Sequence, residues 1–210
     1  MPQCSILTRV VNFAGERRLV RGRITLKKSI GAQAMSFPAP VWVVGTYDAE
    51  GRPNVMTAAW AGICCTQPPC VAVSLRKARY SYGNVTARQA FTISVPSEQH
   101  VKAVDYLGLV SGREVDKFAK AGLTAVGSVL VDAPYVNEFP VVMECKVLHT
   151  IEIGSHTQFI GEILDIKVEE AMLGPEGSPD AEKLGLFVLL NGYRGIGRYL
   201  GEDFSIGKEM

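Results

Sequence analysis

The stretch VWVVGTYDAEGRPNVMTAAWAGICCTQPPCVAVSLRKARYSYGN, residues 41–84, decides the fold of this chain. It opens with residues 41–47, whose β-branched and aromatic side chains favour a strand. The turn at residues 48–51 follows, and its glycine can adopt the positive φ that tight hairpins require. Residues 54–60 are therefore expected to return antiparallel to the first strand.

The segments downstream extend this strand-rich pattern. Pro68 and Pro69 lack the N–H that a sheet interior needs, so a further strand is expected only after them, at residues 70–75. Apolar runs predict additional strands at residues 90–95, 140–153, 157–168 and 184–190. Helical spacing and capping residues predict helices at residues 80–88, after Ser97, and at residues 114–121.

The order of these elements selects the fold class. Strands dominate, hairpin connections are common, and helices are few. The regular strand–helix alternation of a Rossmann sheet is missing. We expect a mainly β fold, an antiparallel, Greek-key-like β-barrel with helical insertions, whose closure also removes exposed strand edges.

Length and charge limit the remaining possibilities. We expect a basic N-terminal extension at residues 1–27 and one domain at residues 28–210. A net charge of +1 gives no support for a nucleic-acid partner. No apolar run is long enough to span a membrane and no signal peptide is recognised, so a cytoplasmic location is expected. The basic charge of this extension predicts a solvated segment. The alternative is that it binds a membrane surface or an acidic partner.

The five cysteines form no metal-binding pattern. No CxxC pair occurs among them, so neither a zinc site nor a disulfide framework is expected. Cys64 and Cys65 are adjacent in the sequence. They are either small residues that fill a strand end or thiols placed close to a redox ring.

The small residues after the first hairpin could accept a flat polar ring. Such a ring needs close packing on its face and backbone partners along its edge. Thr57, Ala58 and Ala59 offer both, and Trp60 could stack against the ring. The alternative is an ordinary strand whose small residues face a neighbouring strand.

A phosphate group would suit the basic segment that precedes the expected helix at residues 80–88. Arg76 and Arg79 can bind phosphate oxygens with a planar guanidinium, and a helix N-terminus adds free N–H groups. Ser81 could either cap that helix or donate to the phosphate. The alternative is a solvated basic loop. Neither of the glycine-rich nucleotide fingerprints occurs in the chain.

Taken together, these segments resemble the flavin reductase-like family of FMN-binding split barrels, and in particular its flavoredoxin-type members. The matching pieces are PVWVVGTYDAEGRPNVMTAAWAGICC, PPCVAVSLRKARYSYGNV, FTISVPS, EFPVVMECKVLHTIEIGSHTQFIGEI and GRYLGEDFSIGK. The resemblance implies FMN at the interface of a homodimer. It implies that the flavin and its phosphate contact Asn54, Val55, Met56, Thr57, Ala58, Ala59, Trp60, Cys64, Cys65, Thr66, Ser74, Arg76, Arg79, Tyr80, Ser81 and Asn84.

One histidine is a candidate catalytic residue. Many relatives carry Gly-Asp-His near the flavin, whereas this chain has Gly154-Ser155-His156. The serine puts any carboxylate role there in doubt. His156 could orient a nicotinamide or stabilise the reduced cofactor, or it could be a structural hairpin histidine.

Three functions are compatible with these residues. The first is an FMN-dependent oxidoreductase that takes hydride from NAD(P)H. The second is an electron-transfer protein that exchanges electrons with a redox partner and has no NAD(P)H site of its own. The third is a flavin storage or sensing protein.

Overall fold

The chain divides by its contacts into two units, Met1–Met35 and Ser36–Met210, and each is described by itself. The computed structural model describes residues 7–11, 14–21, 27–35 and 37–209. In the first unit, β1 (Leu7–Val11) and β2 (Arg17–Arg21) form an antiparallel pair. The domain boundary predicted between residues 27 and 28 stays a prediction.

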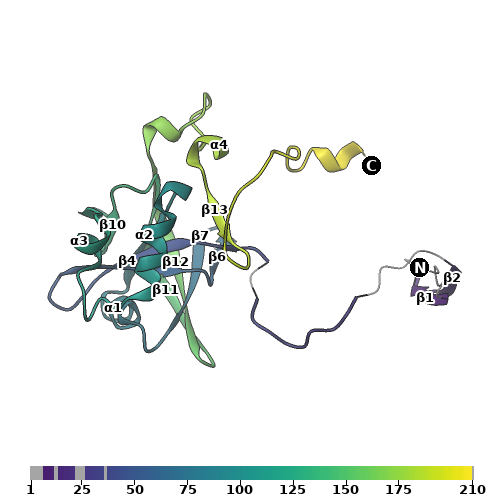
Figure 1. Ribbon diagram of the computed structural model, residues 1–210, viewed down its shortest axis with the longest axis horizontal. Helices are drawn as coiled ribbons and strands as arrows, with labels where there is room; N and C mark the ends of the chain where they lie inside the picture. Colours follow the sequence, from purple (N-terminus) through teal and green to yellow (C-terminus); the bar gives the residue numbers. More distant parts are fainter. Residues whose placement is uncertain (1–6, 12–13, 22–26, 36, 210) are drawn as a thin grey trace. The chain divides into compact units, whose positions relative to one another are not determined.

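The second unit is built on a seven-stranded antiparallel sheet (Figure 1). Its strands, in spatial order, are β5 (Pro53–Ala58), β4 (Trp42–Tyr47), β8 (Ala90–Val95), β11 (Val141–Ile153), β12 (His156–Val168), β7 (Pro69–Arg76) and β6 (Ala61–Thr66). Strand β5 also contacts β7, so the sheet curls back toward itself. The expected mainly β, antiparallel architecture is confirmed.

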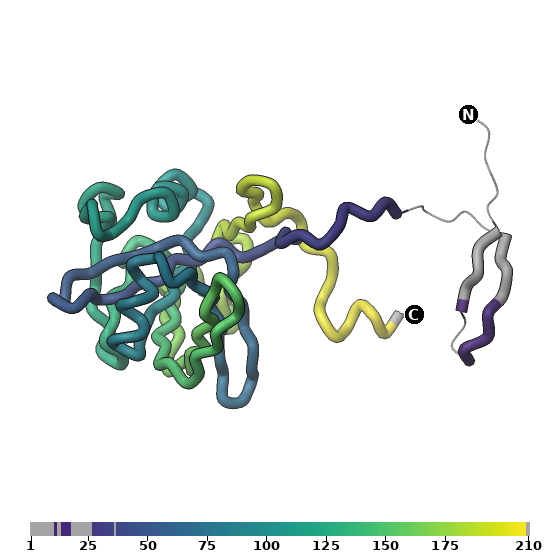
Figure 2. Tube along the Cα trace, turned by 90° about the horizontal axis from the view of Figure 1, so that it is seen from below, coloured from purple at the N-terminus to yellow at the C-terminus, as the bar shows by residue number. Residues whose placement is uncertain are grey.

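Shorter strands and helices complete the second unit, whose chain path Figure 2 shows from a second side. The short strands are β3 (Ala39–Pro40), β9 (Ala125–Gly127), β10 (Pro134–Val136), β13 (Phe187–Leu189) and β14 (Tyr193–Gly195). The helices are α1 (Tyr80–Arg88), α2 (Val101–Leu109), α3 (Lys117–Ala121) and α4 (Ala181–Leu184), with 3₁₀ turns η1 (Glu98–His100), η2 (Glu170–Met172) and η3 (Ile206–Glu209). Within the described residues, no helix is both long and apolar enough to cross a membrane.

Two apolar clusters fill the second unit. Alternation along β4 divides its side chains between them, because successive residues of a strand point to opposite faces. Val44 joins the cluster inside the curled sheet, around Phe91 and Phe159. Val43 joins the cluster beneath α2 and α3, which includes Leu107. The sheet is thus packed on both faces: α1 adds Val85 to the first cluster, whereas α2 and α3 pack on the second.

The helix predicted at residues 80–88 and the strand at residues 90–95 have the predicted bounds. One capping prediction was wrong. Ser97 makes no cap hydrogen bond, and its hydroxyl pairs instead with the Nδ1 atom of His100 at 3.0 Å. Of the two roles left open for Ser81, capping of α1 is ruled out, because the N-cap position belongs to Arg79.

Strand β6 was not predicted. Its residues Ala61–Thr66 pair with β7 across the turn at Gln67 and Pro68. The small side chains and the following prolines gave no strand pattern in the sequence. The strand forms because its backbone completes the hydrogen bonds of β7, which is otherwise paired only with β12.

Candidate functional site

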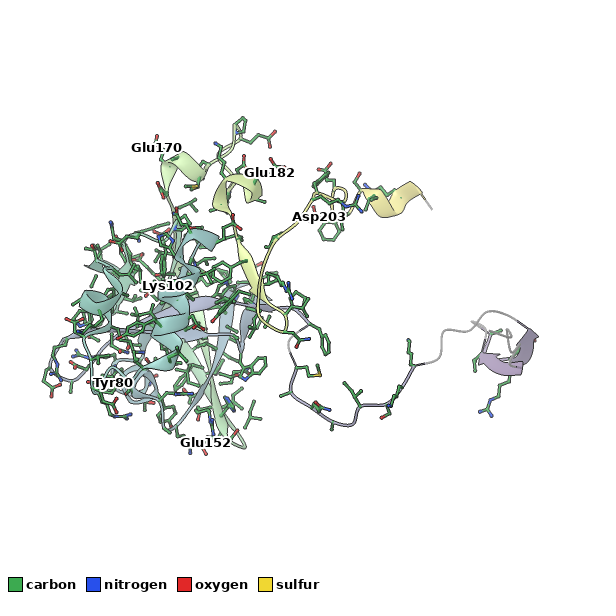
Figure 3. The ribbon with its side chains drawn as sticks, viewed as in Figure 1. Tyr80, Lys102, Glu152, Glu170, Glu182 and Asp203 are labelled. Carbon is green, nitrogen blue, oxygen red and sulfur yellow. The ribbon has the colours of Figure 1, made fainter. Side chains whose placement is uncertain are left out.

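A cavity of about 440 Å³ opens where the end of β5, the end of β7, the start of α1 and the α2–α3 segment meet. Most of the predicted site residues line it: Asn54, Met56, Thr57, Ala58, Ala59, Trp60, Ser74, Arg76, Arg79, Tyr80, Ser81 and His156. Figure 3 labels Tyr80, the first residue of α1. The cavity therefore brings together residues from segments that are far apart in the sequence.

Five predicted contacts lie outside this cavity. Val55 is buried in the cluster beneath α2. Asn84 is buried, and its Nδ2 atom donates to the Thr46 hydroxyl at 3.1 Å. Cys64, Cys65 and Thr66 are exposed on β6. Contact of these five residues with a cofactor stays a prediction.

One end of the cavity is positively charged. Arg76, Arg79 and Lys117 line it, and its described lining includes no acidic side chain. Burial, followed by the nearby charge of Arg79, lowers the pKa of Lys117 to about 8. Like charges held together in a partly buried site favour an anion, because the anion offsets their mutual repulsion.

The N-terminus of helix α1 lies at the same end. No side chain caps this nine-residue helix, and its N-cap residue Arg79 lines the cavity. The first N–H groups of a helix have no partner within the helix, so they and the helix dipole favour a bound anion. A phosphate group therefore fits the residues present.

Asn54 supplies an unpaired polar atom in the cavity wall. Its Nδ2 atom donates to the Ser81 hydroxyl at 2.9 Å, whereas its buried Oδ1 atom has no partner. A Cβ atom on Gly112 would lie only 2.0 Å from that Oδ1 atom. Gly112 thus packs directly against the side-chain carbonyl of Asn54, where a larger residue would not fit. A buried acceptor without a partner is costly, so a ligand that donates a hydrogen bond there would stabilise the site.

Tyr80 is held in place from two sides. Its hydroxyl donates to the Oδ2 atom of Asp48 at 2.8 Å, and the Arg113 guanidinium lies 5.1 Å from its ring centre. Burial, with the hydrogen bond to Asp48, raises the pKa of the Tyr80 hydroxyl. Its hydroxyl is therefore committed to Asp48, and its ring forms part of the cavity wall.

His156 lines the cavity at the start of β12, directly opposite Arg76 on β7. Its Nδ1 atom lies 2.9 Å from the hydroxyl of Ser155. Ser155 thus orients the imidazole of His156.

Sequence reasoning missed the cavity wall formed by the α2–α3 segment. This wall comprises Leu107, Gly108, Val110, Ser111, Gly112 and Lys117. Two further lining residues, Leu75 and Ala78, were also missed. This wall is fixed through Thr57, whose hydroxyl donates to the Val104 carbonyl at 2.5 Å. The amine of Lys117 donates to the Leu107 carbonyl at 2.7 Å. The sequence offered one weak signal for this wall: Lys117 stands beside the apolar Phe118, a few residues after Ser111 and Gly112.

Known proteins resemble this chain over most of its length. The sequence model of the family described as "Flavin reductase like domain" matches residues 34–193. The flavoredoxin of Desulfovibrio vulgaris (Miyazaki F) is 52% identical, with a TM-score of 0.83 over 87% of this chain and 100% of that chain. The flavoredoxin from Methanosarcina acetivorans is 30% identical, with a TM-score of 0.82 over 88% of this chain and 99% of that chain. An uncharacterized protein of Archaeoglobus fulgidus is 34% identical over 61% of this chain and 72% of its own length.

Proposed function

Because this chain belongs to the flavin reductase-like family, with flavoredoxin-type relatives, we propose that it binds FMN and moves electrons through it as an oxidoreductase. The split-barrel fold expected from the sequence is confirmed by the same comparisons. One observation carries the proposal for FMN in particular. The cationic end of the cavity lies at the uncapped start of α1, where a flavin phosphate would sit.

Different residues of the cavity would bind different parts of FMN. Arg76, Arg79 and Lys117 would hold the phosphate, together with the first N–H groups of α1. The Oδ1 atom of Asn54 would accept a hydrogen bond from the ligand. The small side chains of β5 and the turn after it leave room for a flat ring.

When bound, the flavin supplies the redox chemistry, while the protein supplies position and charge. Trp60, which is 40% exposed, would cover part of the ring. We assign His156 the role of holding a proton or a substrate group at the cavity, with its ring oriented by Ser155. The tight contact between Thr57 and α2 keeps the cavity wall from shifting.

The direct test is an equilibrium titration of the apoprotein with FMN and with riboflavin, which lacks the phosphate. FMN is expected to bind in stoichiometric amounts, and riboflavin about tenfold to 100-fold more weakly, because a charge-assisted bond contributes roughly 1.5–3 kcal/mol. Absence of FMN binding, or equal affinity for the two ligands, would contradict the proposal.

Two candidate functions differ in the electron donor that reduces the flavin. An NAD(P)H-dependent reductase is the first. An electron carrier without its own NAD(P)H site is the second, and the two solved relatives named flavoredoxin favour it. A flavin storage protein is the non-redox alternative.

An anaerobic experiment separates these candidates. The FMN-loaded protein is mixed with NADH, with NADPH and with dithionite, and the visible flavin absorbance is followed. Rapid bleaching by either nicotinamide would establish a reductase. Bleaching by dithionite alone would favour the electron carrier. A cytoplasmic location stays a prediction.

We also propose that the active form is a homodimer. Every residue of β11 from Leu148 to Ile153 is exposed, although three of them are large and apolar. We call this segment, Leu148 to Ile153, the arm of β11. Glu152, labelled in Figure 3, lies near its end. Exposed apolar side chains on neighbouring strands mark an interaction surface. A second copy of this chain would cover the arm.

A further inference from the structure

The hairpin of β6 and β7 gathers three thiols outside the cavity. Cys65 of β6 and Cys70 of β7 are direct partners in the antiparallel register. A bulge between Ile63 and Cys65 makes Cys64 the extra residue of β6. In Figure 2 the turn of this hairpin is the blue loop that projects from the sheet. Four of the chain's cysteines are described, and all four are free thiols.

The register of Cys65 and Cys70 suits a disulfide. Directly opposed residues of antiparallel strands point to the same face, with Cα atoms about 4.5–5.5 Å apart. A disulfide spans Cα separations of about 4.4–6.8 Å. The two cysteines can therefore be bridged with little backbone movement. Cys64 has no partner opposite it on β7.

The thiols of Cys65 and Cys70 also differ in solvent exposure, and this difference favours a stepwise oxidation. Cys65 is exposed and Cys70 is buried, so a dissolved oxidant meets Cys65 first. Burial raises the pKa of the Cys70 thiol, and so does the neighbouring Cys65, which shares a side-chain hydrogen bond with it. Cys70 is thus protected from direct attack by the oxidant, but it lies opposite Cys65 and within reach of an oxidised Cys65 sulfur.

We propose that Cys65 and Cys70 form a reversible disulfide when a hydroperoxide oxidises Cys65. The Cys65 sulfur attacks the terminal oxygen of the hydroperoxide, and the O–O bond breaks. The leaving alkoxide takes the Cys65 proton and departs as an alcohol, or as water from hydrogen peroxide. Cys65 becomes a sulfenic acid.

The second step forms the disulfide. The Cys70 sulfur attacks the Cys65 sulfur and displaces hydroxide, which takes the Cys70 proton and leaves as water. One S–S bond forms, two S–H bonds are lost, and the hydroperoxide has accepted two electrons. The new bond joins β6, the last strand of the sheet, to β7. Reductive thiol exchange reverses the process.

The interior offers a contrast to this pair. Cys145 lies in the core around Phe91, and burial followed by the nearby Cys70 raises its pKa far above the ordinary value for a thiol. It is not expected to react with a dissolved peroxide. The oxidation should therefore stop at the hairpin and consume two thiols.

The test uses full-length protein that has been reduced, freed of reductant and treated with one equivalent of hydrogen peroxide. Two of the five thiols should be lost within one chain, and the intact mass should fall by two hydrogen atoms. Dithiothreitol should restore both thiols. Flavin reduction plays no part in the assay, so its result is independent of the proposed function.

Two exposed-site variants make the result specific. Cys64→Ser should behave as the unaltered protein, whereas Cys65→Ser should form no disulfide. Both positions are exposed, so neither change disturbs the core. Loss of the disulfide in Cys64→Ser, its persistence in Cys65→Ser, or oxidation only between chains would overturn the proposal.

Discussion

At the residue scale, Asp48 holds the turn between β4 and β5 to the start of α1. Its carboxylate accepts from the backbone N–H of Arg52 at 2.8 Å and from the Tyr80 hydroxyl at 2.8 Å. Burial alone would raise the pKa of Asp48, but these bonds and the Arg52 side chain lower it to about 2. One carboxylate thus fixes both the first hairpin and a wall of the cavity.

Replacing Asp48 by Asn should lower the free energy of unfolding at pH 7 by about 2 kcal/mol. The pKa in the folded state lies below the unfolded value of 3.8, so the contribution is present above that value. It is lost as the pH falls from 3.8 toward about 2, and urea unfolding across this range measures it. Glu50→Gln is the control, since its exposed pair with Arg52 should contribute less than about 1 kcal/mol. Equal stability of Asp48→Asn and the unaltered protein would refute the role given to Asp48.

Lys117 should make FMN binding depend on pH. Its pKa of about 8 means that it loses its proton, and its attraction for phosphate, as the pH rises past 8. A single linked proton should weaken binding roughly tenfold between pH 7 and pH 9. The same group makes the free protein more stable from about pH 8 toward 10.5, because the unfolded chain holds the proton more tightly.

The variant Lys117→Met should flatten this pH profile and weaken FMN binding at pH 7. Lys120→Met is the matched control, since Lys120 lies on the same helix but is exposed and outside the cavity. A profile that keeps its slope in Lys117→Met would remove Lys117 from the phosphate site.

At the element scale, the segment between α2 and α3 shapes the cavity through Gly112. A Cβ atom there would meet the Oδ1 atom of Asn54 at 2.0 Å and the Tyr80 ring at 2.9 Å. Gly112→Ala should weaken FMN binding by about 1–3 kcal/mol, because two cavity walls must move apart. Fluorescence titration measures the change. Gly83→Ala on α1 has open space around its Cβ and should leave FMN affinity unaltered.

The same scale explains what the sequence could and could not predict. Helix α1 and strand β8 carry their own signals, and both were predicted with the observed bounds. Strand β6 carries none, because it is held by pairing with β7 rather than by its own composition. Lys117 was missed for a related reason. Its place in the cavity depends on packing of α2 and α3 against β5, which no local pattern encodes.

The cationic end of the cavity was predicted in part. Arg76 and Arg79 precede a helix whose start is visible in the sequence, and both line the cavity. The role of Ser81 was less visible. Its hydroxyl accepts from Asn54, a residue on a distant strand, and a sequence does not reveal that pairing. Long-range side-chain partners thus set the details that local motifs leave open.

At the scale of the whole molecule, the exposed arm of β11 predicts a dimer whose loss releases FMN. Ile151→Lys should yield monomers by light scattering, because a charge would be buried at the interface. Dilution of the unaltered protein should release FMN as the subunits separate. Val129→Lys is the control, since Val129 is 87% exposed and is not part of β11. A monomer that holds FMN stoichiometrically would contradict this assembly.

The central claim is that the cationic end of the cavity binds the phosphate of FMN, and one comparison tests it most directly. FMN affinity is measured for Arg76→Ala and for Lys77→Ala. Lys77 is the neighbouring residue, but its amine pairs with Glu152 at 2.6 Å on the surface and it does not line the cavity. Arg76→Ala should weaken binding by roughly 1.5–3 kcal/mol, and Lys77→Ala by less than about 0.5 kcal/mol. Unchanged affinity in Arg76→Ala, or an equal loss in both variants, would contradict the account.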